Sequence, residues 1–245
     1  MESVGCAGSA VTSALAPLLA QELLVSTPPL APKPFLDLLS PEDRSALIER
    51  CGRRTLGRRQ LLFVTGEPRG SVYLLRTGRV KLVRRTDAGG EVIVGLCGPG
   101  DIVGYSGLSA LPPRMLTAQV IEAGEAHTID EPDFRSFLTA RPVAALAVIE
   151  AVRRRLETLR DSMVDVVSED VPHRILRLLR RLAIAQGQRP DDPKGELSLD
   201  LRLTHQEVAN MIGARRQTVT TAINDMHRNG ELRRDQHRIV IGNPR

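Results

Sequence analysis

Seven short apolar runs occupy residues 60–129, and each ends in glycine or another turn-forming residue. Each run has the length of a β-strand, is rich in Val, Ile or Leu, and is followed by a turn signal. The segment DAGG at 87–90 is typical of a hairpin turn, since glycine tolerates positive φ. Short strands at this spacing predict a small antiparallel barrel or sandwich.

The pattern changes after Arg141-Pro142, because residues 143–167 contain neither glycine nor proline. A helix here places apolar side chains alternately three and four residues apart, which is the spacing of a heptad seam. The seam consists of Ile149, Val152, Leu156, Leu159, Met163 and Val166. It favours pairing with a second copy of the chain. It covers only about two and a half heptads, so packing of the helix on its own barrel stays open as an alternative.

The flanking segments carry clear start signals for further helices. Four prolines in residues 25–34 predict an extended connector, and Ser40-Pro41 predicts a short helix that ends near Arg50. Asp170 is suited to cap a helix over 173–186. In that helix we expect Ile175, Leu178, Leu179 and Leu182 to face inward and Arg174, Arg177, Arg180 and Arg181 to face solvent. A polar loop and a strand near 196–201 follow.

Residues 203–229 give the strongest local signal. Thr204 and Glu207 have the spacing of a capping box. Val208, Met211 and Ile212 form the inner face of a first helix, and Val219, Ile223 and Met226 form that of a second. Gly213 permits a tight turn between the two, so the segment predicts a helix-turn-helix whose second helix starts near Arg215 and Arg216.

The polar residues of the second helix have the chemistry needed to read bases. Arginine can donate two hydrogen bonds to guanine, and glutamine can pair with adenine. We expect Arg216 and Gln217 to reach base edges, and Arg215, Thr218, Thr220 and Thr221 to contact phosphates or bases beside them. Two short strands then predict a wing that carries Arg233, Arg234 and Arg238 next to the groove.

Charge and composition narrow the function. Residues 170–245 contain fourteen Lys or Arg and nine Asp or Glu, so they hold the whole formal charge of +5 and favour a polyanionic partner. Cys6, Cys51 and Cys97 form neither a disulfide framework nor a metal motif, which suits a reducing cytoplasm. We find no phosphate-binding loop, metal-ligand spacing or catalytic triad, and therefore predict neither an enzyme nor a membrane protein.

From about residue 58 to 243, the order of these features resembles the cyclic-AMP receptor protein/FNR family of bacterial regulators. The resemblance rests on GEPRGSVYLLRTGRVKL (66–82), GDIVG (100–104), Arg154-Arg155-Leu156, the helix-turn-helix and the wing. It implies an α+β chain with a cyclic-nucleotide-binding-type β-roll, a long dimerisation helix and a C-terminal winged helix-turn-helix. The expected parts are a flexible leader (1–34), an effector domain (35–140), the dimerisation helix (141–168) and a DNA-binding domain (169–245). The family's partners would be palindromic double-stranded DNA, a second copy and RNA polymerase.

The resemblance places a ligand site at Gly104, Tyr105, Ser106, Arg114, Arg155 and Leu159. Members that bind cyclic AMP have a glutamate where Tyr105 stands and a Thr-Ser pair where Leu159-Arg160 stand. Losing the ribose-binding carboxylate removes a charge-assisted hydrogen bond, which disfavours cyclic AMP. The cyanobacterial-type global nitrogen regulators, which the chain resembles within the family, imply 2-oxoglutarate held by Arg114 and Arg155. An empty, constitutive barrel remains open, so no cofactor is assigned.

The second helix departs from the family's recognition pattern at two positions. The family's recognition pattern Arg-Glu-x-x-x-Arg is here Arg216 to Thr221, with Gln217 for the glutamate and Thr221 for the second arginine. We therefore expect a different half-site with the same docking mode. The alternative function is a ligand-sensing module whose winged helix docks a protein partner. The arginines clustered at the start of the second helix favour DNA.

Overall fold

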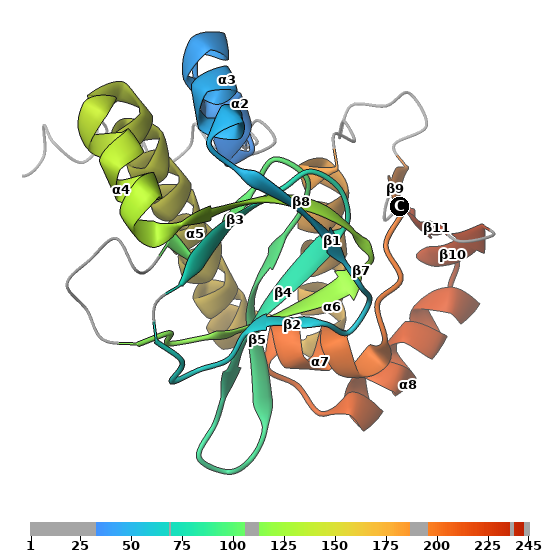
Figure 1. Cartoon of the computed structure of the whole chain (residues 1–245). Helices are drawn as coiled ribbons and strands as arrows, with labels where there is room; N and C mark the ends of the chain where they lie inside the picture. Colours follow the sequence, from blue (N-terminus) through green and yellow to red (C-terminus); the bar gives the residue numbers. More distant parts are fainter. Residues whose placement is uncertain (1–32, 69, 106–112, 187–195, 236–237, 243–245) are drawn as a thin grey trace, which may run out of the picture. The chain divides into compact units, whose positions relative to one another are not determined.

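The computed structural model describes residues 33–68, 70–105, 113–186, 196–235 and 238–242, and Figure 1 traces them in sequence order. Apart from Lys33 and Pro34, the predicted leader lies outside the described residues, as does Ser106. Two short helices come first, α2 (Phe35–Leu38) and α3 (Pro41–Glu49). Ser40 caps α3 as predicted, because its side chain accepts a hydrogen bond from the backbone N–H of Asp43 at 3.0 Å.

Two four-stranded antiparallel sheets make the β-roll. One has the order β1 (Gly52–Leu56), β8 (Gly124–Asp130), β3 (Ser71–Leu75), β6 (Ile102–Val103). The other has the order β2 (Leu61–Phe63), β7 (Thr117–Glu122), β4 (Arg79–Arg85), β5 (Glu91–Cys97). Leucine, valine and alanine side chains from both sheets share one core. The predicted hairpin turn joins β4 to β5, with Gly89 at φ +78°.

Three elements of this domain were not foreseen from the sequence. Helix α2 has only four residues, too few to show a periodic pattern. Strand β1 is an edge strand in which four of five residues are exposed, so no apolar alternation marks it. Helix α4 (Glu131–Ala140) follows β8 directly, and its buried Phe134 and Phe137 stack at 6.4 Å. It begins at the residue after the last predicted strand, so no turn signal separated the two elements in the sequence.

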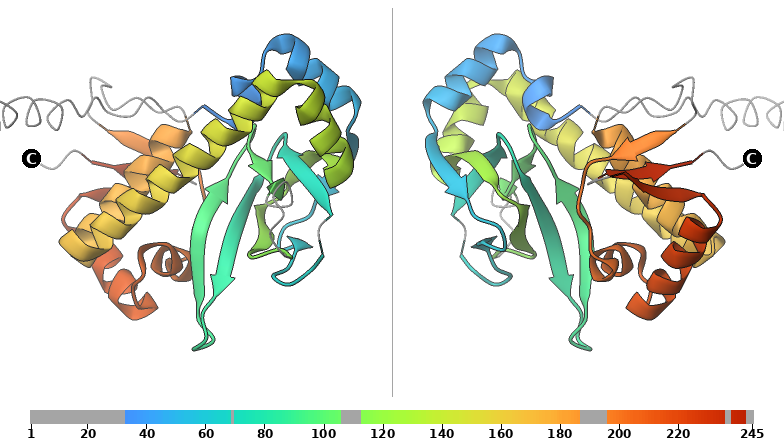
Figure 2. Two further views of the ribbon diagram at one scale, coloured as in Figure 1. Left: turned by 90° about the vertical axis from the view of Figure 1, so that its left-hand side faces the viewer. Right: turned by 90° about the vertical axis from the view of Figure 1, so that its right-hand side faces the viewer.

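The predicted long helix is α5 (Pro142–Ser168), which Figure 2 shows as one unbroken rod. Its first half packs on the outside of the β-roll, where Ala144, Ala147 and Val148 are buried with residues of α2, α3, α4 and β3. Small side chains on this face let the helix approach the sheet closely. Further along the helix, Arg155 contacts Cys97 of β5 and Asp165 is buried against α6, while the apolar seam stays exposed.

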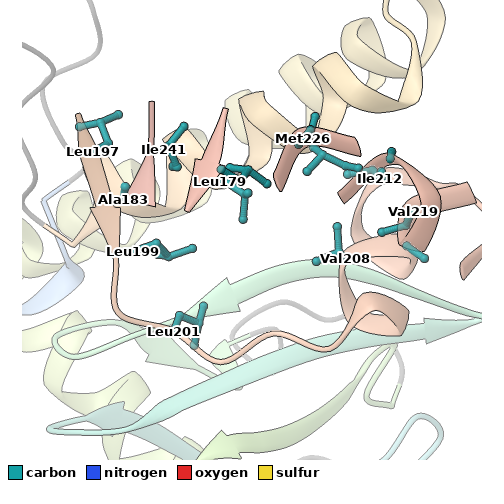
Figure 3. Close-up of a cluster of buried hydrophobic side chains, with 14 residues drawn as sticks. Leu179, Ala183, Leu197, Leu199, Leu201, Val208, Ile212, Val219, Met226 and Ile241 are labelled. Carbon is teal, nitrogen blue, oxygen red and sulfur yellow. The ribbon is translucent and has the colours of Figure 1, made fainter. Parts of the chain in front are cut away.

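The C-terminal domain is a winged helix. It consists of α6 (Val171–Ala185), β9 (Leu197–Leu199), α7 (His205–Ile212), α8 (Arg216–Arg228), β10 (Leu232–Asp235) and β11 (Arg238–Ile241), with sheet order β10-β11-β9. Figure 3 shows the aliphatic core that joins the three helices to the sheet. The predicted fold class, a β-roll, a long helix and a winged helix-turn-helix, is confirmed.

The junction between α5 and α6 corrects one expectation about surface charge. Asp170 caps α6 as predicted, by accepting the backbone N–H of His173 at 3.0 Å. The arginines of α6 do not all face solvent, however. Arg174 donates to the carbonyl of Ile212 at 2.9 Å and so satisfies the end of α7. Arg181 lies 2.7 Å from the buried carboxylate of Asp165 on α5.

Candidate DNA-binding surface, dimer seam and effector pocket

Local interactions fix the two helices of the helix-turn-helix. The capping box forms as predicted: the Thr204 hydroxyl accepts the backbone N–H of Glu207, and the Glu207 carboxylate accepts the backbone N–H of Thr204 at 2.9 Å. Gly213 ends α7 in the left-handed conformation at φ +64°. A side chain at that position would be strained, so glycine lets α8 begin three residues later.

The amino-terminal end of α8 projects polar side chains into solvent. Arg215 is the N-cap residue, and Arg216, Gln217 and Thr218 occupy the first turn; all four are exposed, as is Thr221. Beneath them Val219 is fully buried and Met226 nearly so. The helix therefore has a firmly packed inner face and a free outer face that carries the residues predicted to contact DNA.

Thr220 lies differently from its neighbours. Its hydroxyl donates to the carbonyl of Arg216 at 2.9 Å and lies 3.0 Å from Nδ1 of His205 on α7. Burial, together with the nearby positive charges of Arg216 and Arg234, lowers the pKa of His205. The structure therefore places Thr220 in the contact between the two helices. His205 was not singled out in the sequence, because a lone histidine at a helix start carries no distinctive pattern.

The wing carries the three predicted arginines on β10 and β11. Arg234 and Arg238 are exposed. Arg233 is also exposed but forms an ion pair with Glu196, which precedes β9. The wing therefore has two exposed arginines, Arg234 and Arg238, and a third, Arg233, whose ion pair joins β10 to the residue before β9.

The heptad seam is uncovered in the single chain. Ile149, Val152, Leu156, Leu159, Met163 and Val166 expose between 37% and 70% of their surface. Apolar side chains in a continuous exposed stripe mark an interaction surface. Val164 and Val167 widen this stripe near the end of α5, and Val167 is 88% exposed. Sequence reasoning missed both residues because they fall outside the three-four spacing.

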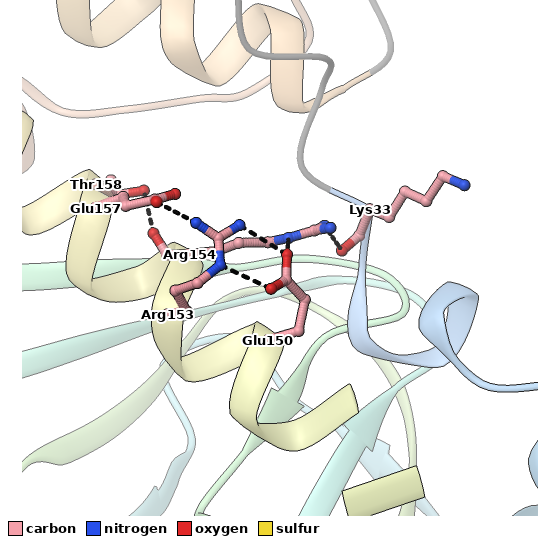
Figure 4. A network of polar contacts seen from close by, with 6 residues as sticks. All are labelled: Lys33, Glu150, Arg153, Arg154, Glu157 and Thr158. Carbon is pink, nitrogen blue, oxygen red and sulfur yellow. Dashed lines mark hydrogen bonds and ion pairs between the residues drawn. The ribbon is translucent and has the colours of Figure 1, made fainter. Parts of the chain in front are cut away.

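Another face of α5 is charged. Figure 4 shows Glu150 between Arg153 and Arg154, with Glu157 completing the network. The distances from Glu150 to these guanidinium nitrogens are 2.6–2.8 Å. Both arginines hold the pKa of Glu150 low, at about 2. Ion pairs between residues three and four positions apart support an exposed helix, so α5 has one charged face and one apolar face.

In the predicted effector site, Arg114 is nearly buried, with 5% of its surface exposed. Its terminal nitrogens donate to the carbonyls of Gly104 at 2.5 Å and Ser71 at 2.8 Å, and its guanidinium carbon stacks 4.2 Å from the Phe63 ring centre. Nε of Arg114 is buried without a partner among the described residues. Burial lowers the pKa of this arginine.

The second predicted arginine approaches the same turn from α5. Arg155 donates to the Tyr105 hydroxyl at 3.4 Å and to Sγ of Cys97 at 3.5 Å. Arg114 thus contacts Gly104, and Arg155 contacts the next residue, Tyr105, through its side chain. Leu159 instead lies on the exposed seam, one helical turn further along. Within the described residues, no three His, Cys, Asp or Glu side chains cluster as a metal site, and no helix is long and apolar enough for a membrane span.

Comparison with known proteins matches both domains separately. A family model described as "Cyclic nucleotide-binding domain" matches residues 53–141, and one described as "Crp-like helix-turn-helix domain" matches residues 173–245. Among curated proteins, the chain is 29% identical over 203 residues to a CRP-like cAMP-activated global transcriptional regulator of Mycobacterium tuberculosis, covering 83% of this chain and 89% of the relative. The chain belongs to the CRP/FNR family of transcription regulators.

Other members of the CRP/FNR family match at similar coverage. A global nitrogen regulator of Synechocystis is 25% identical over 78% of this chain and 84% of its own length. The solved structure of the c-di-GMP responsive global regulator CLP from Xanthomonas campestris has a TM-score of 0.69 at 21% identity, covering 84% of this chain and all of that chain. FixK2 from Bradyrhizobium japonicum has a TM-score of 0.67 at 18% identity, covering 79% and 93%. The two family models and the curated relatives confirm a transcription regulator with a DNA-binding helix-turn-helix domain, a class of protein that is not enzymatic. The two solved structures support the fold.

Proposed function

We propose that this CRP/FNR regulator works as a homodimer that recognises a palindromic DNA site with two α8 helices in adjacent major grooves. The observation that carries the proposal is the free amino-terminal end of α8, where Arg215, Arg216, Gln217 and Thr218 are exposed above a buried Val219. Side chains at this end of a recognition helix reach base edges when the helix lies in the groove. Regulation would then act on RNA polymerase at promoters that contain such sites.

The seam on α5 supports the dimer. It is the one helix face on which the described residues form an uninterrupted apolar stripe left exposed, and it continues toward the winged domain. Pairing two seams would bury these side chains and fix the separation of the two recognition helices. Dimers of this geometry bind half-sites about one helical turn apart, roughly 34–36 Å.

The test is selection of genomic fragments with purified protein, followed by affinity measurements on the enriched site. We expect a two-fold palindrome and an affinity that falls steeply with salt, because phosphate contacts release counterions. Arg216→Ala should weaken binding by roughly 10–100-fold, since a bidentate arginine–guanine pair is worth about 1–3 kcal/mol. Arg228→Ala is the control, because it removes the same charge from the other end of α8.

An absent palindrome, or equal losses in Arg216→Ala and Arg228→Ala, would contradict specific readout by α8. Unchanged DNA mobility together with stable capture of a protein partner would favour the alternative of a protein-docking module. The two outcomes are distinguishable because the first needs only DNA and purified protein.

We further propose that the β-roll binds a small organic acid, similar in charge to 2-oxoglutarate, in preference to cyclic AMP. Arg114 donates to the Gly104 carbonyl and Arg155 to the Tyr105 hydroxyl, so each guanidinium contacts one of two consecutive residues. Arg114 is buried with Nε unpartnered among the described residues, which suits an incoming anion. Tyr105 offers a phenol where a ribose-binding carboxylate would be required for cyclic AMP.

Isothermal calorimetry with 2-oxoglutarate and with cyclic AMP tests the choice. We expect heat from the acid alone, and its loss in Arg114→Gln, which keeps a polar side chain but removes the guanidinium charge. Tight binding of cyclic AMP would overturn the preference. The absence of binding by either compound would support the third possibility, an empty and constitutive barrel.

A further inference from the structure

A β-bulge interrupts the β4–β5 ladder at a glycine. Leu82 pairs with Gly95 and Val83 with Ile93, so Val94 is the extra residue of the bulge. Bulges bend a strand and redirect its side chains. Gly95 lies beside this bulge in a strand interior, where glycine weakens the sheet unless close approach of another group requires it.

The close approach comes from α5. A Cβ atom on Gly95 would overlap Nη2 of Arg155 and lie 3.3 Å from both Cζ and Nε. The backbone of Gly95 is outside the positive-φ region, so its conformation does not itself demand glycine. Space for the guanidinium is therefore the physical reason that glycine stands at this position.

Arg155 packs against Gly95 and connects three elements. It rises from α5, covers Sγ of Cys97 on β5, and reaches the Tyr105 hydroxyl on the turn after β6. Cys97 is 4% exposed, and burial raises the pKa of its thiol. The charge of Arg155 also acts on the half-buried Asp101, where it offsets part of the increase in pKa that burial causes.

We propose that Gly95 is a positioning residue that admits Arg155 into the barrel wall and so joins the effector turn to the dimerisation helix. The packing of Arg155 against Gly95 does not depend on the proposed function. Only its regulatory role rests on that function. Because the overlap involves the end of a side chain, Gly95→Ala moves the guanidinium and leaves the strand in place. Cys97 then loses its cover.

Alkylation of the full chain by iodoacetamide, without DNA or ligand, tests the packing of Arg155 against Gly95. Mass spectrometry of the peptides gives the labelling rate of each cysteine. Gly95→Ala should raise the labelling rate of Cys97 severalfold. Cys51, whose thiol donates to the Leu47 carbonyl in another part of the domain, is the internal reference and should label at an unchanged rate. Gly98→Ala is the matched control, since a Cβ there meets nothing within 4 Å.

A double-mutant comparison separates positioning from general loosening. Arg155→Leu should also expose Cys97, and Gly95→Ala added to it should have no further effect on labelling. In the Arg155→Leu background, alanine at 95 should leave the free energy of unfolding unchanged or raise it, because glycine is unfavourable inside a strand. Additive effects, or equal acceleration of Cys51 and Cys97, would overturn the proposal.

DNA affinity tests whether the Gly95–Arg155 contact has a regulatory role. Gly95→Ala should weaken affinity for the selected DNA site, as Arg155→Leu does, while Gly98→Ala should not. Faster Cys97 labelling with unchanged DNA affinity would support the Gly95–Arg155 packing and reject its role in coupling the effector turn to DNA binding. A failure of specific DNA binding by the unmodified protein would refute the proposed function and leave the labelling result intact.

Discussion

Replacing Leu156 by aspartate should separate the proposed dimer without touching a DNA contact. Leu156 lies at the middle of the seam and is 47% exposed in the single chain. Full burial of a leucine contributes about 1.5–3 kcal/mol, so covering half of one contributes about 1 kcal/mol. Two-fold symmetry doubles that to about 2 kcal/mol for the pair.

The aspartate adds an electrostatic cost. Two carboxylates would face each other across the seam, and burying an unpaired charge costs several kcal/mol. Even a partial penalty of about 2 kcal/mol brings the total loss to about 4 kcal/mol, which weakens dimerisation roughly a thousandfold. DNA affinity should fall with it, because a monomer contacts only one half-site.

Sedimentation equilibrium gives the dimer dissociation constant, and fluorescence anisotropy compares a full palindrome with an isolated half-site. Thr158→Asp is the control, because it adds the same charge to the same helix at an exposed position off the seam. Circular dichroism checks that both variants fold. A dimeric Leu156→Asp protein, or a monomeric one that binds the full site as tightly as the unmodified chain, would refute the reasoning.

Three further outcomes are expected. Thr204→Ala should lower the free energy of unfolding by about 1 kcal/mol in urea denaturation through loss of the N-cap, and an unchanged midpoint would contradict the capping role. Asp165→Asn should cost about 2–3 kcal/mol by removing a carboxylate paired with two arginines of α6, and full stability would show that solvent screens those pairs. In NMR titrations His205 should ionise below pH ~6.5 and His173 above it. The cause is burial for His205 and the Asp170 hydrogen bond for His173. His173 therefore stabilises the fold at acid pH and loses that effect as pH rises through its raised pKa, whereas His205 destabilises it as pH falls below about 6.5.

Most of the fold could be predicted from local patterns in the sequence. The capping box at Thr204, the turn at Gly213 and the N-cap at Asp170 each depend on residues within a few positions of one another, and all form as expected. The uninterrupted helix over α5 follows from the same kind of signal. Strand β1 was not predicted, because an edge strand with exposed residues shows no apolar alternation.

Contacts between residues far apart in the sequence could not be predicted in the same way. The sequence indicated Arg114 and Arg155 as members of one site. It gave no sign that Arg114 donates to a carbonyl 43 residues away. Nor did it indicate that Gly95 admits Arg155, since that relation depends on how closely α5 packs on β5. Thr220 and His205 are a similar case, because their contact requires the final angle between two helices.

The hydrogen bond from Arg174 to the Ile212 carbonyl has a consequence for the thermodynamics of DNA binding. It ties the end of α7 to α6, and the His205–Thr220 contact ties α7 to α8. The three helices thus arrive at the groove already ordered, and little conformational entropy is lost on association. The heat capacity change of complex formation should therefore reflect the contact surface alone, without the larger negative value that accompanies coupled folding.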